Sequence, residues 1–433
     1  MSVFRAGTNK SSVNNFPSVR PTLDLDFANT KTLDPRITFT RASGGSYVGA
    51  DGLIKYAGVN EARFDHDPVT GESLGLLIEE SRQNLLRYSE EADNPVWNIL
   101  GSSIIVDPNS TTSPDGNQTA DKVQEAAIVG SHSIEFTGFA FQQNITYTVS
   151  FFAKAAERTR LRVTWPNIFT NRIAFVDIDT STYGVISDGG TITNIYPFGN
   201  GWFRIVSTST CTSTTTGARA GITLVDTGTN VNYTGDGTSG IYIWGAQLEV
   251  GASPTSYIPT QGSARTRAVD SALITGKNFS DFYNQSEGTF CVSSSFYADG
   301  GAAQLIFQVD NGSGGYRSGI TFRNELSGNQ IRAYDINASA SNIAFDFWTH
   351  TGSTINTEYK TAFALKSNDM AAVTNYPEGT YGLVSSTSRI LRERTTLRLG
   401  SAISNTTQLN GTISQLTYYP KRLPNQQLQV LTR

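Results

Sequence analysis

The chain has 433 residues, which predicts at least two domains because a single core rarely serves more than about 250 residues. Only 16% of the residues are charged, 38% are hydrophobic and 40 are glycine, a balance that favours short strands joined by tight turns over helices. The formal net charge is -4 and no run of basic residues occurs, which argues against nucleic acid as a partner.

Two cysteines, Cys211 and Cys291, are too few for a disulfide framework or a thiolate metal site. The first residues lack the apolar segment of a signal peptide, and no apolar run approaches the roughly 20 residues that a membrane span needs. We therefore expect a protein that folds in a cytosol, is stabilised by packing and does not insert into a membrane.

Residues 1–21 contain few large apolar side chains and are interpreted as an extended attachment arm, with a disordered terminus as the alternative. Residues 22–27, TLDLDF, then alternate apolar and acidic side chains, as a half-buried strand does, and residues 37–41 repeat this pattern. Residues 76–88 are predicted to hold a short helix, because their leucines and tyrosine would fall roughly on one face.

Four segments in this first part of the chain carry recognisable motifs: LDLDF at 23–27, TFTRA at 38–42, ARFD at 62–65 and LLIEESRQNLL at 76–86. These motifs closely resemble a recurrent module of tailed-bacteriophage structural proteins, which include head-spike, head-fibre and tail-fibre proteins. The resemblance implies that residues 22–90 form a small β-rich module of a virion protein.

The next part of the chain, residues 91–262, consists of short β-branched and aromatic runs separated by turn residues, a spacing that predicts a sandwich of two packed sheets. Its motifs are SPDG at 113–116, YTVSF at 147–151, GWFR at 201–204, WGAQLE at 244–249 and SYIPT at 256–260. Their succession resembles the carbohydrate-binding-module-like jelly roll that follows the same phage module. A small and polar passage, residues 263–285, is predicted to be a linker.

The last part of the chain, residues 286–433, again alternates apolar and polar residues in short runs and predicts a second sandwich. Its closing segments, LRLG at 397–400 and LNGTISQLTYYPKRLP at 409–424, look like the C-terminal signature of concanavalin A-like lectin and laminin-G-type domains. The expected fold is therefore all-β, with tandem β-sandwich (jelly-roll) domains behind an extended N-terminal arm.

Hydrolysis of a glycosidic bond needs two carboxylates about 5–10 Å apart. The candidate pairs are Asp24/Asp26, Asp65/Asp67 and Glu79/Glu80. The first pair alternates with apolar residues, which is typical of the solvated face of a strand. The last module lacks the Glu-x-Asp-x-x-Glu cluster that marks glycosidases with a concanavalin A-like fold. We therefore assign no catalytic residue and do not expect an enzyme.

The three histidines are not accompanied by the Gly-x-Ser-x-Gly motif of a serine hydrolase, and no Gly-rich nucleotide-binding loop occurs. Histidine-based metal sites are not expected either, because so few histidines are available. We expect no cofactor and assign no metal ligand. A structural calcium ion, held in a loop by Asp, Asn and carbonyl oxygens, stays an open alternative.

Sugar recognition would use an exposed aromatic face that stacks on a pyranose ring, with amides and carboxylates nearby to bind its hydroxyls. Trp165, at a predicted strand end, is the first candidate for a glycan-binding residue, and Tyr233, in a polar loop, is the second. For both residues, core packing or a subunit contact is the alternative interpretation. Trp202 and Trp244 lie inside apolar runs and are expected in the core.

These observations lead to the hypothesis of a bacteriophage virion structural protein, a fibre, spike or decoration subunit that is assembled in the host cytoplasm and acts as an adhesin on host-surface glycans. Its expected partners are other capsid or tail proteins, a host-surface glycan and itself. The resemblance to adhesins that form three-fold assemblies implies a homotrimer, in which weak sugar contacts add up through multivalency. One alternative is a depolymerase of envelope polysaccharide. A second alternative is a purely architectural capsid or tail subunit.

Overall fold

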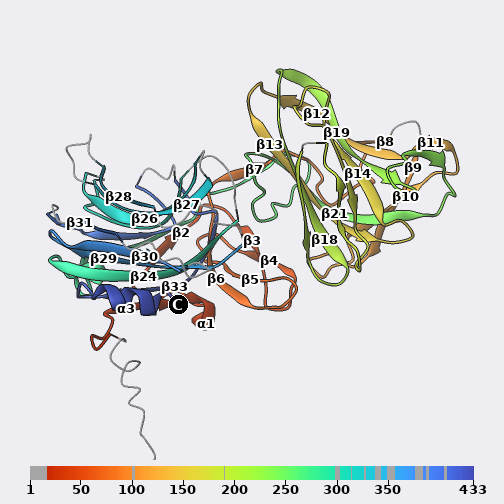
Figure 1. Ribbon diagram of the computed structural model, residues 1–433. Coiled ribbons are helices and arrows are strands. Elements are labelled where there is room, and N and C mark those ends of the chain that lie inside the picture. Colours follow the sequence, from red (N-terminus) through yellow and green to blue (C-terminus); the bar gives the residue numbers. More distant parts are fainter. Residues whose placement is uncertain are drawn as a thin grey trace, which may run out of the picture.

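The computed structural model describes residues 17–99, 103–189, 191–297, 303–313, 315–325, 328–336, 343–348, 356–375, 384–386, 390–403 and 407–433. Most of the predicted N-terminal arm lies outside these residues. Strands dominate the described chain, and its helices are short: α1 (Phe27–Thr30), α2 (Gly276–Ser280) and α3 (Asn425–Leu431). The predicted all-β class is confirmed, and two sandwiches lie side by side (Figure 1).

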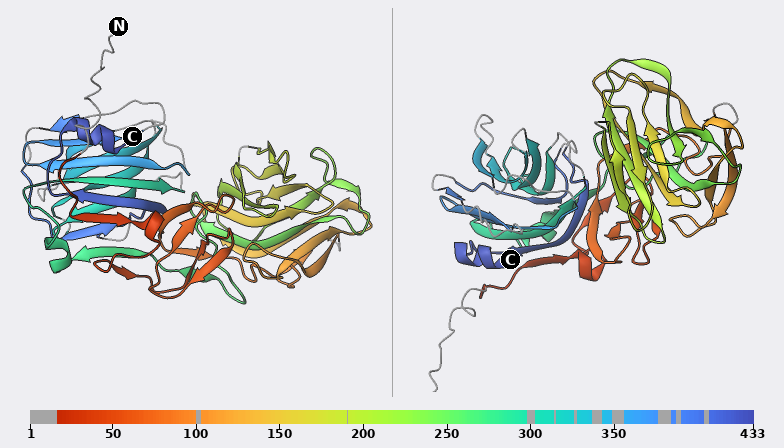
Figure 2. Two further views of the ribbon diagram at one scale, coloured as in Figure 1. Left: turned by 90° about the horizontal axis from the view of Figure 1, so that it is seen from below. Right: turned by 45° about the vertical axis from the view of Figure 1, so that its right-hand side comes forward.

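One sheet combines strands from both ends of the chain. Its order is β31-β30-β29-β24-β33-β6-β5, and β1 also pairs with β33. Its strands are β1 (Leu23–Asp26), β5 (Phe64–His66), β6 (Ser73–Ile78), β24 (Glu287–Phe296), β29 (Tyr359–Lys366), β30 (Met370–Thr374), β31 (Val384–Ser386) and β33 (Gly411–Tyr419). N-terminal strands therefore form one end of a largely C-terminal sheet (Figure 2).

A second sheet packs against the first, in the order β2-β23-β32-β25-β26-β27-β28. Its strands are β2 (Thr38–Thr40), β23 (Ser271–Thr275), β25 (Gln304–Asp310), β26 (Arg317–Glu325), β27 (Gly328–Ile336), β28 (Ile343–Trp348) and β32 (Thr396–Leu399). The shared core draws apolar residues from both ends of the chain, including Leu25, Leu76, Phe290 and Leu416. We call the unit formed by these two sheets the composite sandwich.

The predicted alternation in residues 22–27 is confirmed in β1. Leu23 and Leu25 are buried in the core, whereas Asp24 faces outward. There the Asp24 carboxylate accepts hydrogen bonds from the side chains of Gln415 and Thr417, each at 3.0 Å. Asp24 thus stabilises the pairing of β1 with β33, on the outer face of the sheet where the alternation placed it.

The division of the chain differs from the predicted one, because residues 22–90 do not form a module of their own. They supply β1, β2, β5 and β6 to the composite sandwich, together with strands from residues 286–433. Four strands of three to six residues bury too little apolar surface to fold alone, so they pair with distant strands. Local sequence patterns do not indicate that β1, β2 and β6 pair with strands hundreds of residues away in the chain.

The helix predicted for residues 76–88 is wrong, since this segment forms β6 and then β7 (Arg82–Asn84). Leu76, Leu77 and Ile78 are all buried. Leu76 and Ile78 belong to the core of the composite sandwich, whereas Leu77 lines a cavity on the side of the other sandwich. A strand covered on both faces has a continuous apolar run, which periodicity alone does not distinguish from a helix.

The other sandwich is inserted between β7 and β22 (Arg265–Arg267), and we call it the inserted sandwich. One of its sheets contains β9 (Ile104–Thr111), β10 (Ala120–Glu125), β13 (Thr146–Ala155), β17 (Ile192–Pro197), β18 (Trp202–Thr210) and β21 (Gly240–Val250). The other contains β8 (Trp97–Ile99), β12 (Ser133–Phe141), β14 (Arg160–Thr164), β15 (Ile173–Asp177), β16 (Gly184–Ser187) and β19 (Thr215–Val225). A two-sheet sandwich is the arrangement expected from the spacing of the apolar runs.

Three pairs of short strands complete the described fold: β3 (Gly45–Val48) with β4 (Ile54–Ala57), β11 (Val129–Ser131) with β20 (Asn232–Thr234), and β7 with β22. The last pair joins the segment that enters the inserted sandwich to the segment that leaves it. The predicted linker, residues 263–285, is thus ordered, since it contains β22, β23 and α2. The chain enters and leaves the inserted sandwich at one junction.

Candidate functional site

The junction contains a network of five buried charged residues, which we call the junction network. Its members are Arg41, Arg63, Glu79, Arg267 and Asp270. Arg63 donates to Glu79 at 2.7 Å and to Asp270 at 2.5 Å. Arg41 lies 3.1 Å from Asp270, and Arg267 lies 3.2 Å from Glu79. Because each carboxylate has at least two arginine partners, the buried negative charges are compensated.

The three arginines exceed the two carboxylates by one positive charge, and backbone carbonyl groups compensate for it. Arg41 donates to the carbonyl oxygens of Ser43 and Gly58, both at 2.8 Å. Arg63 donates to the carbonyl oxygen of Ser46, also at 2.8 Å. Buried guanidinium groups need such acceptors, because each N–H left unpaired in the interior costs free energy.

Ser256, which follows the inserted sandwich, binds the junction network directly. Its backbone N–H and its hydroxyl both donate to the Glu79 carboxylate at 2.7 Å. Burial alone would raise the pKa of Glu79, but Arg267, Arg63 and these two donors outweigh it and lower the pKa to about 2. Glu79 is therefore a charged structural anchor between the two sandwiches, with no capacity left to accept a proton near neutral pH.

Two amide side chains fasten the same junction. Asn84 donates to the carbonyl oxygens of Ala246 at 3.1 Å and Ile258 at 2.9 Å, and its own oxygen accepts from the N–H of Leu248 at 3.0 Å. Gln247 accepts from the N–H of Ile258 at 2.6 Å. The motifs LLIEESRQNLL, WGAQLE and SYIPT are thus in contact at the point where the chain enters and leaves the inserted sandwich.

Trp202 and Trp244 are buried, as expected, but they belong to a small apolar cluster at the junction. The cluster also contains Ile54 from β4 and Tyr257 from the SYIPT motif. The indole N–H of Trp244 donates to the hydroxyl of Thr119 at 3.0 Å. This apolar cluster lies next to the junction network, and both hold the two sandwiches together.

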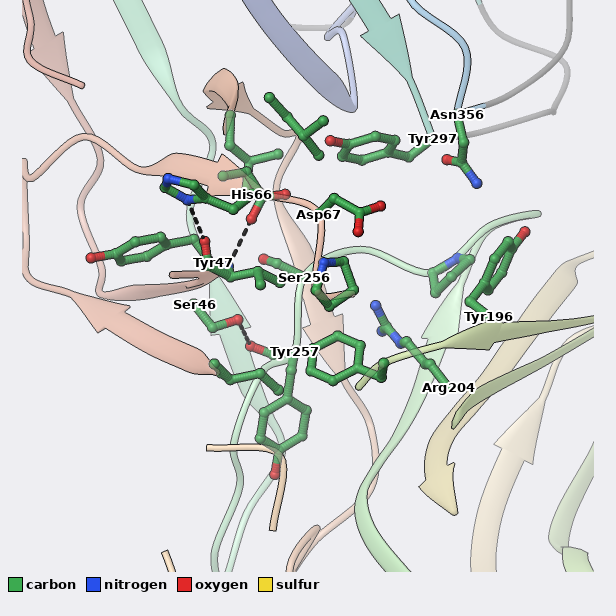
Figure 3. Close-up of a pocket in the computed structure, with 18 of the residues that line it drawn as sticks. Ser46, Tyr47, His66, Asp67, Tyr196, Arg204, Ser256, Tyr257, Tyr297 and Asn356 are labelled. Carbon is green, nitrogen blue, oxygen red and sulfur yellow. Dashed lines mark hydrogen bonds between the residues drawn. The ribbon is translucent and has the colours of Figure 1, made fainter. Parts of the chain in front are cut away.

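A cavity of about 420 Å³ opens beside the junction network, between the two sandwiches (Figure 3). We call it the inter-sandwich cavity. Its volume lies within the range of roughly 300–1,000 Å³ that is usual for small-molecule sites. The composite sandwich contributes Asp67, which follows β5, and Asn356, which precedes β29. The inserted sandwich contributes Tyr196 from β17 and Arg204 from β18.

Apolar and aromatic side chains form much of the cavity wall: Val48, Ile54, Pro68, Val69, Leu74, Leu77, Phe152, Pro197, Phe198 and Pro254. Asp67, Asn356, Tyr196 and Arg204 surround a common space in Figure 3. A largely apolar wall with a few polar groups is the usual composition of a site that binds an organic ligand.

The position of the Asp67 carboxylate is fixed by its own turn. Its Oδ1 atom accepts from the backbone N–H groups of Val69 at 2.9 Å and Thr70 at 2.7 Å. These N–H donors outweigh burial and lower the pKa of Asp67, so the carboxylate is charged at neutral pH. Asp67 is therefore a pre-positioned acceptor at the cavity.

Arg204 brings a guanidinium group to the opposite wall. Its Nη2 atom donates to the hydroxyl of Ser150 at 3.0 Å and to the carbonyl oxygen of Thr255 at 2.7 Å. The guanidinium carbon lies 5.5 Å from the centroid of the Phe152 ring, at a distance that allows a cation–π contact. Within the described residues, its buried Nε atom has no hydrogen-bond partner. Arg204 thus places a positive charge on this wall of the cavity.

Asp65 and His66 also line the cavity, and both residues are buried. The Asp65 carboxylate accepts from the N–H of Val48 at 2.7 Å. Burial raises the pKa of Asp65 to about 7, because this backbone donor offsets only part of the desolvation. The Nδ1 atom of His66 lies 3.0 Å from the carbonyl oxygen of Val48.

Neither glycan-binding residue predicted from the sequence offers an exposed ring face. Trp165 is 2% exposed, packs against the Phe169 ring in a tilted arrangement and donates to the hydroxyl of Ser207 at 3.0 Å. Tyr233 is 8% exposed, and its hydroxyl donates to Glu125 at 2.8 Å. The alternative of core packing therefore describes both residues, and neither lines the inter-sandwich cavity.

The sequence-based search missed the cavity because its polar residues come from distant parts of the chain. Asp67, Arg204 and Asn356 share no local motif, and only the fold brings them together. Of the carboxylate pairs considered, Asp65 and Asp67 both line the cavity. Glu79 of the third pair also lines it but belongs to the junction network, and Glu80 accepts from Arg82 at 2.7 Å.

Two further features concern metals and membranes. In the parts of the chain that the structure describes, no group of three or more His, Cys, Asp and Glu side chains is placed to hold a metal ion. No helix among the described residues has the length and apolar character needed to cross a membrane. Cys211 and Cys291 are free thiols.

Comparisons with known proteins identify no matching family model and no matching curated protein. Among solved structures, the chain is similar to the Ruminococcus gnavus IT-sialidase CBM40 bound to alpha2,3 sialyllactose, with a TM-score of 0.28 and 13% identity over 34% of this chain and 83% of that chain. It is similar to Trypanosoma rangeli sialidase in complex with the inhibitor DANA, with a TM-score of 0.28 and 10% identity over 72% and 60% of the two chains. It is also similar to domains LG4-5 of the mouse laminin alpha1 chain, with a TM-score of 0.21 and 6% identity over 79% and 88%.

Proposed function

We propose that this chain is a structural subunit at the surface of a bacteriophage particle, a fibre, spike or decoration subunit, and that it binds carbohydrate on the host cell. The junction network is the observation that carries the structural part of this proposal. Arg41, Arg63 and Glu79 lie in the motifs that resemble phage structural proteins, and all three are used to join the sandwiches. The motifs that carry the resemblance therefore supply residues that join the sandwiches, which supports a structural role.

The inter-sandwich cavity supports the carbohydrate-binding part of the proposal. Aromatic rings, prolines, a carboxylate, an amide and a guanidinium group line it together. Carbohydrates present both hydroxyl groups and apolar C–H faces, so they need this mixture of partners. A homotrimer would place three such cavities on one particle component and would add weak contacts through effective concentration.

The structural role is tested on purified particles. Electron microscopy with an antibody against this chain should label the particle exterior, and mass spectrometry should find the chain in the same particles. Sedimentation of the isolated protein should give the mass of a trimer. Particles that carry neither label nor chain would contradict the virion assignment.

A second candidate function, hydrolysis of envelope polysaccharide, is favoured by one specific observation. Asp65 and Asp67 line the same cavity, and the pKa of Asp65 is raised to about 7 whereas that of Asp67 is lowered. Two carboxylates whose pKa values differ in this way suit a general acid and its charged partner. New reducing ends released from host polysaccharide by the wild-type protein, and not by Asp65→Asn, would favour this candidate over an adhesin.

A further inference from the structure

The inter-sandwich cavity also limits the chemistry of its ligand, and this inference rests on the carbohydrate-binding part of the proposed function. We propose that the cavity binds an uncharged pyranose at the end of a glycan and excludes acidic sugars, with both sandwiches contributing to the same sugar ring. Three properties of the cavity support this proposal: the balance of its charges, the pairing of its donors and acceptors, and its apolar wall.

The charge balance of the cavity disfavours an anionic ligand. Asp65, Asp67 and Glu79 line it, and among the lining residues that the structure describes Arg204 supplies the one guanidinium group. Glu79 is neutralised by arginines of the junction network, and Arg204 is already shared with two oxygen acceptors. A sugar carboxylate in this partly buried space would meet the charged Asp67 with little compensating positive charge, and burial makes such repulsion stronger than in water.

The donors and acceptors of the cavity match neutral hydroxyl groups instead. A hydroxyl group both donates and accepts, so it can donate to the Asp67 carboxylate and accept from the guanidinium group of Arg204, since both residues line the cavity. The side-chain amide of Asn356 provides a further donor and acceptor at the same opening. An uncharged pyranose satisfies all three side chains without placing an unpaired charge in the cavity.

The apolar wall suits the C–H face of a sugar ring. Tyr196, Pro197 and Phe198 come from the inserted sandwich, and Pro68 and Val69 come from the composite sandwich. Aromatic and proline rings offer flat apolar surfaces on which a pyranose packs. A ligand held between these walls contacts both sandwiches, which the junction network holds next to each other.

A glycan array probed with the full chain tests the proposal. The array carries glycans ending in glucose, galactose, mannose or N-acetylglucosamine, and matched glycans ending in sialic or uronic acid. We expect binding to members of the neutral set and at least tenfold weaker binding to their acidic counterparts. Preferential binding of acidic glycans would overturn the proposal and leave carbohydrate binding intact, whereas silence across the whole array would overturn both.

Two conservative variants test whether the cavity is the site. Asp67→Asn keeps the oxygen that accepts from Val69 and Thr70 but replaces the other carboxylate oxygen by an amide. Asn356→Gly removes the side chain and preserves the left-handed backbone at φ 58°. Each variant should weaken binding of the neutral glycan roughly tenfold or more, the effect of losing a hydrogen bond in a site.

Matched controls come from turns outside the cavity. Asp179→Asn changes a carboxylate that likewise caps its own turn, at 2.8 Å from the N–H of Ser181. Asn368→Gly changes an exposed asparagine with φ 62°. Both controls should bind glycan as the wild type does. Equal binding by the cavity variants and the controls would place the sugar elsewhere and overturn the proposal.

Discussion

The junction network and the inter-sandwich cavity lie side by side, but the pKa of a buried carboxyl group is lowered in the first and raised in the second. In the network, Glu79 has two arginine partners and two donors from Ser256, and its pKa falls to about 2. In the cavity, Asp65 has a backbone donor as its main compensation for burial, and its pKa rises to about 7. Carboxylates that are paired with arginines join the sandwiches, whereas the cavity carboxylates of Asp65 and Asp67 are held by backbone N–H groups.

The largest effect is expected from removing a network carboxylate. Asp270→Ala would leave Arg41 and Arg63 buried without their shared partner, which typically costs about 3–5 kcal/mol. Denaturant unfolding followed by fluorescence measures this loss. Asp281→Ala, which breaks an exposed pair with Lys277, is the control and should change stability little. Equal losses in both variants would contradict the role given to the network.

The second prediction concerns stability at neutral and alkaline pH. The pKa of Asp65 is raised from 3.8 to about 7 on folding, so its protonated form favours the folded state. Its contribution to stability is therefore complete below pH 4 and is lost as pH rises to about 7. Asp65→Asn keeps an acceptor for Val48 and should stabilise the protein at pH 8, by at most about 4 kcal/mol. A variant no more stable than the wild type at pH 8 would contradict the raised pKa.

The third prediction has the opposite sign and concerns acid. The pKa of Glu79 is lowered from 4.5 to about 2, so its contribution is complete above pH 4.5 and is lost as pH falls toward 2. The ionised form favours the folded state by at most about 3 kcal/mol. Glu79→Gln should lower stability at pH 7 and flatten its decline between pH 4.5 and pH 2. An unchanged acid profile in unfolding experiments would refute this account of the junction.

The smallest effect is expected in the cavity. Asp67→Asn and Asn356→Gly preserve the local backbone, so each should alter the free energy of unfolding by less than about 1 kcal/mol. Thermal unfolding of the two variants measures this difference. A large loss of stability would mean that the cavity residues build the junction rather than serve a ligand.

Local patterns in the sequence predicted the strands but not their partners. The alternation of TLDLDF placed Leu23 and Leu25 in a core correctly, and the apolar surroundings of Trp202 and Trp244 predicted their burial. The pairing of Leu23 with Tyr418 cannot be read from the residues of either strand, because backbone hydrogen bonds do not depend on side-chain type. The predicted domain boundaries therefore separated residues 22–90 from residues 286–433, although both segments contribute strands to the composite sandwich.

The candidate site was the least predictable feature. Trp165 lies at a strand end, which suggested an exposed ring, but the ring is buried and contacts Phe169 and Ser207. Tyr233 was assigned to a polar loop, whereas it forms part of β20 and donates a hydrogen bond to Glu125. The exposure of a side chain depends on which distant residues pack over it. Local sequence patterns do not identify those residues, so exposure is known only once the fold is known.

Hydrogen exchange, measured with and without the neutral glycan that binds most tightly in the array, tests the central claim most directly. The account predicts slower exchange in both sandwiches at once, around residues 66–70 and residues 195–205, with little change at the distant β29–β30 hairpin. Protection confined to one sandwich, or absent from both segments, would contradict a sugar site between them.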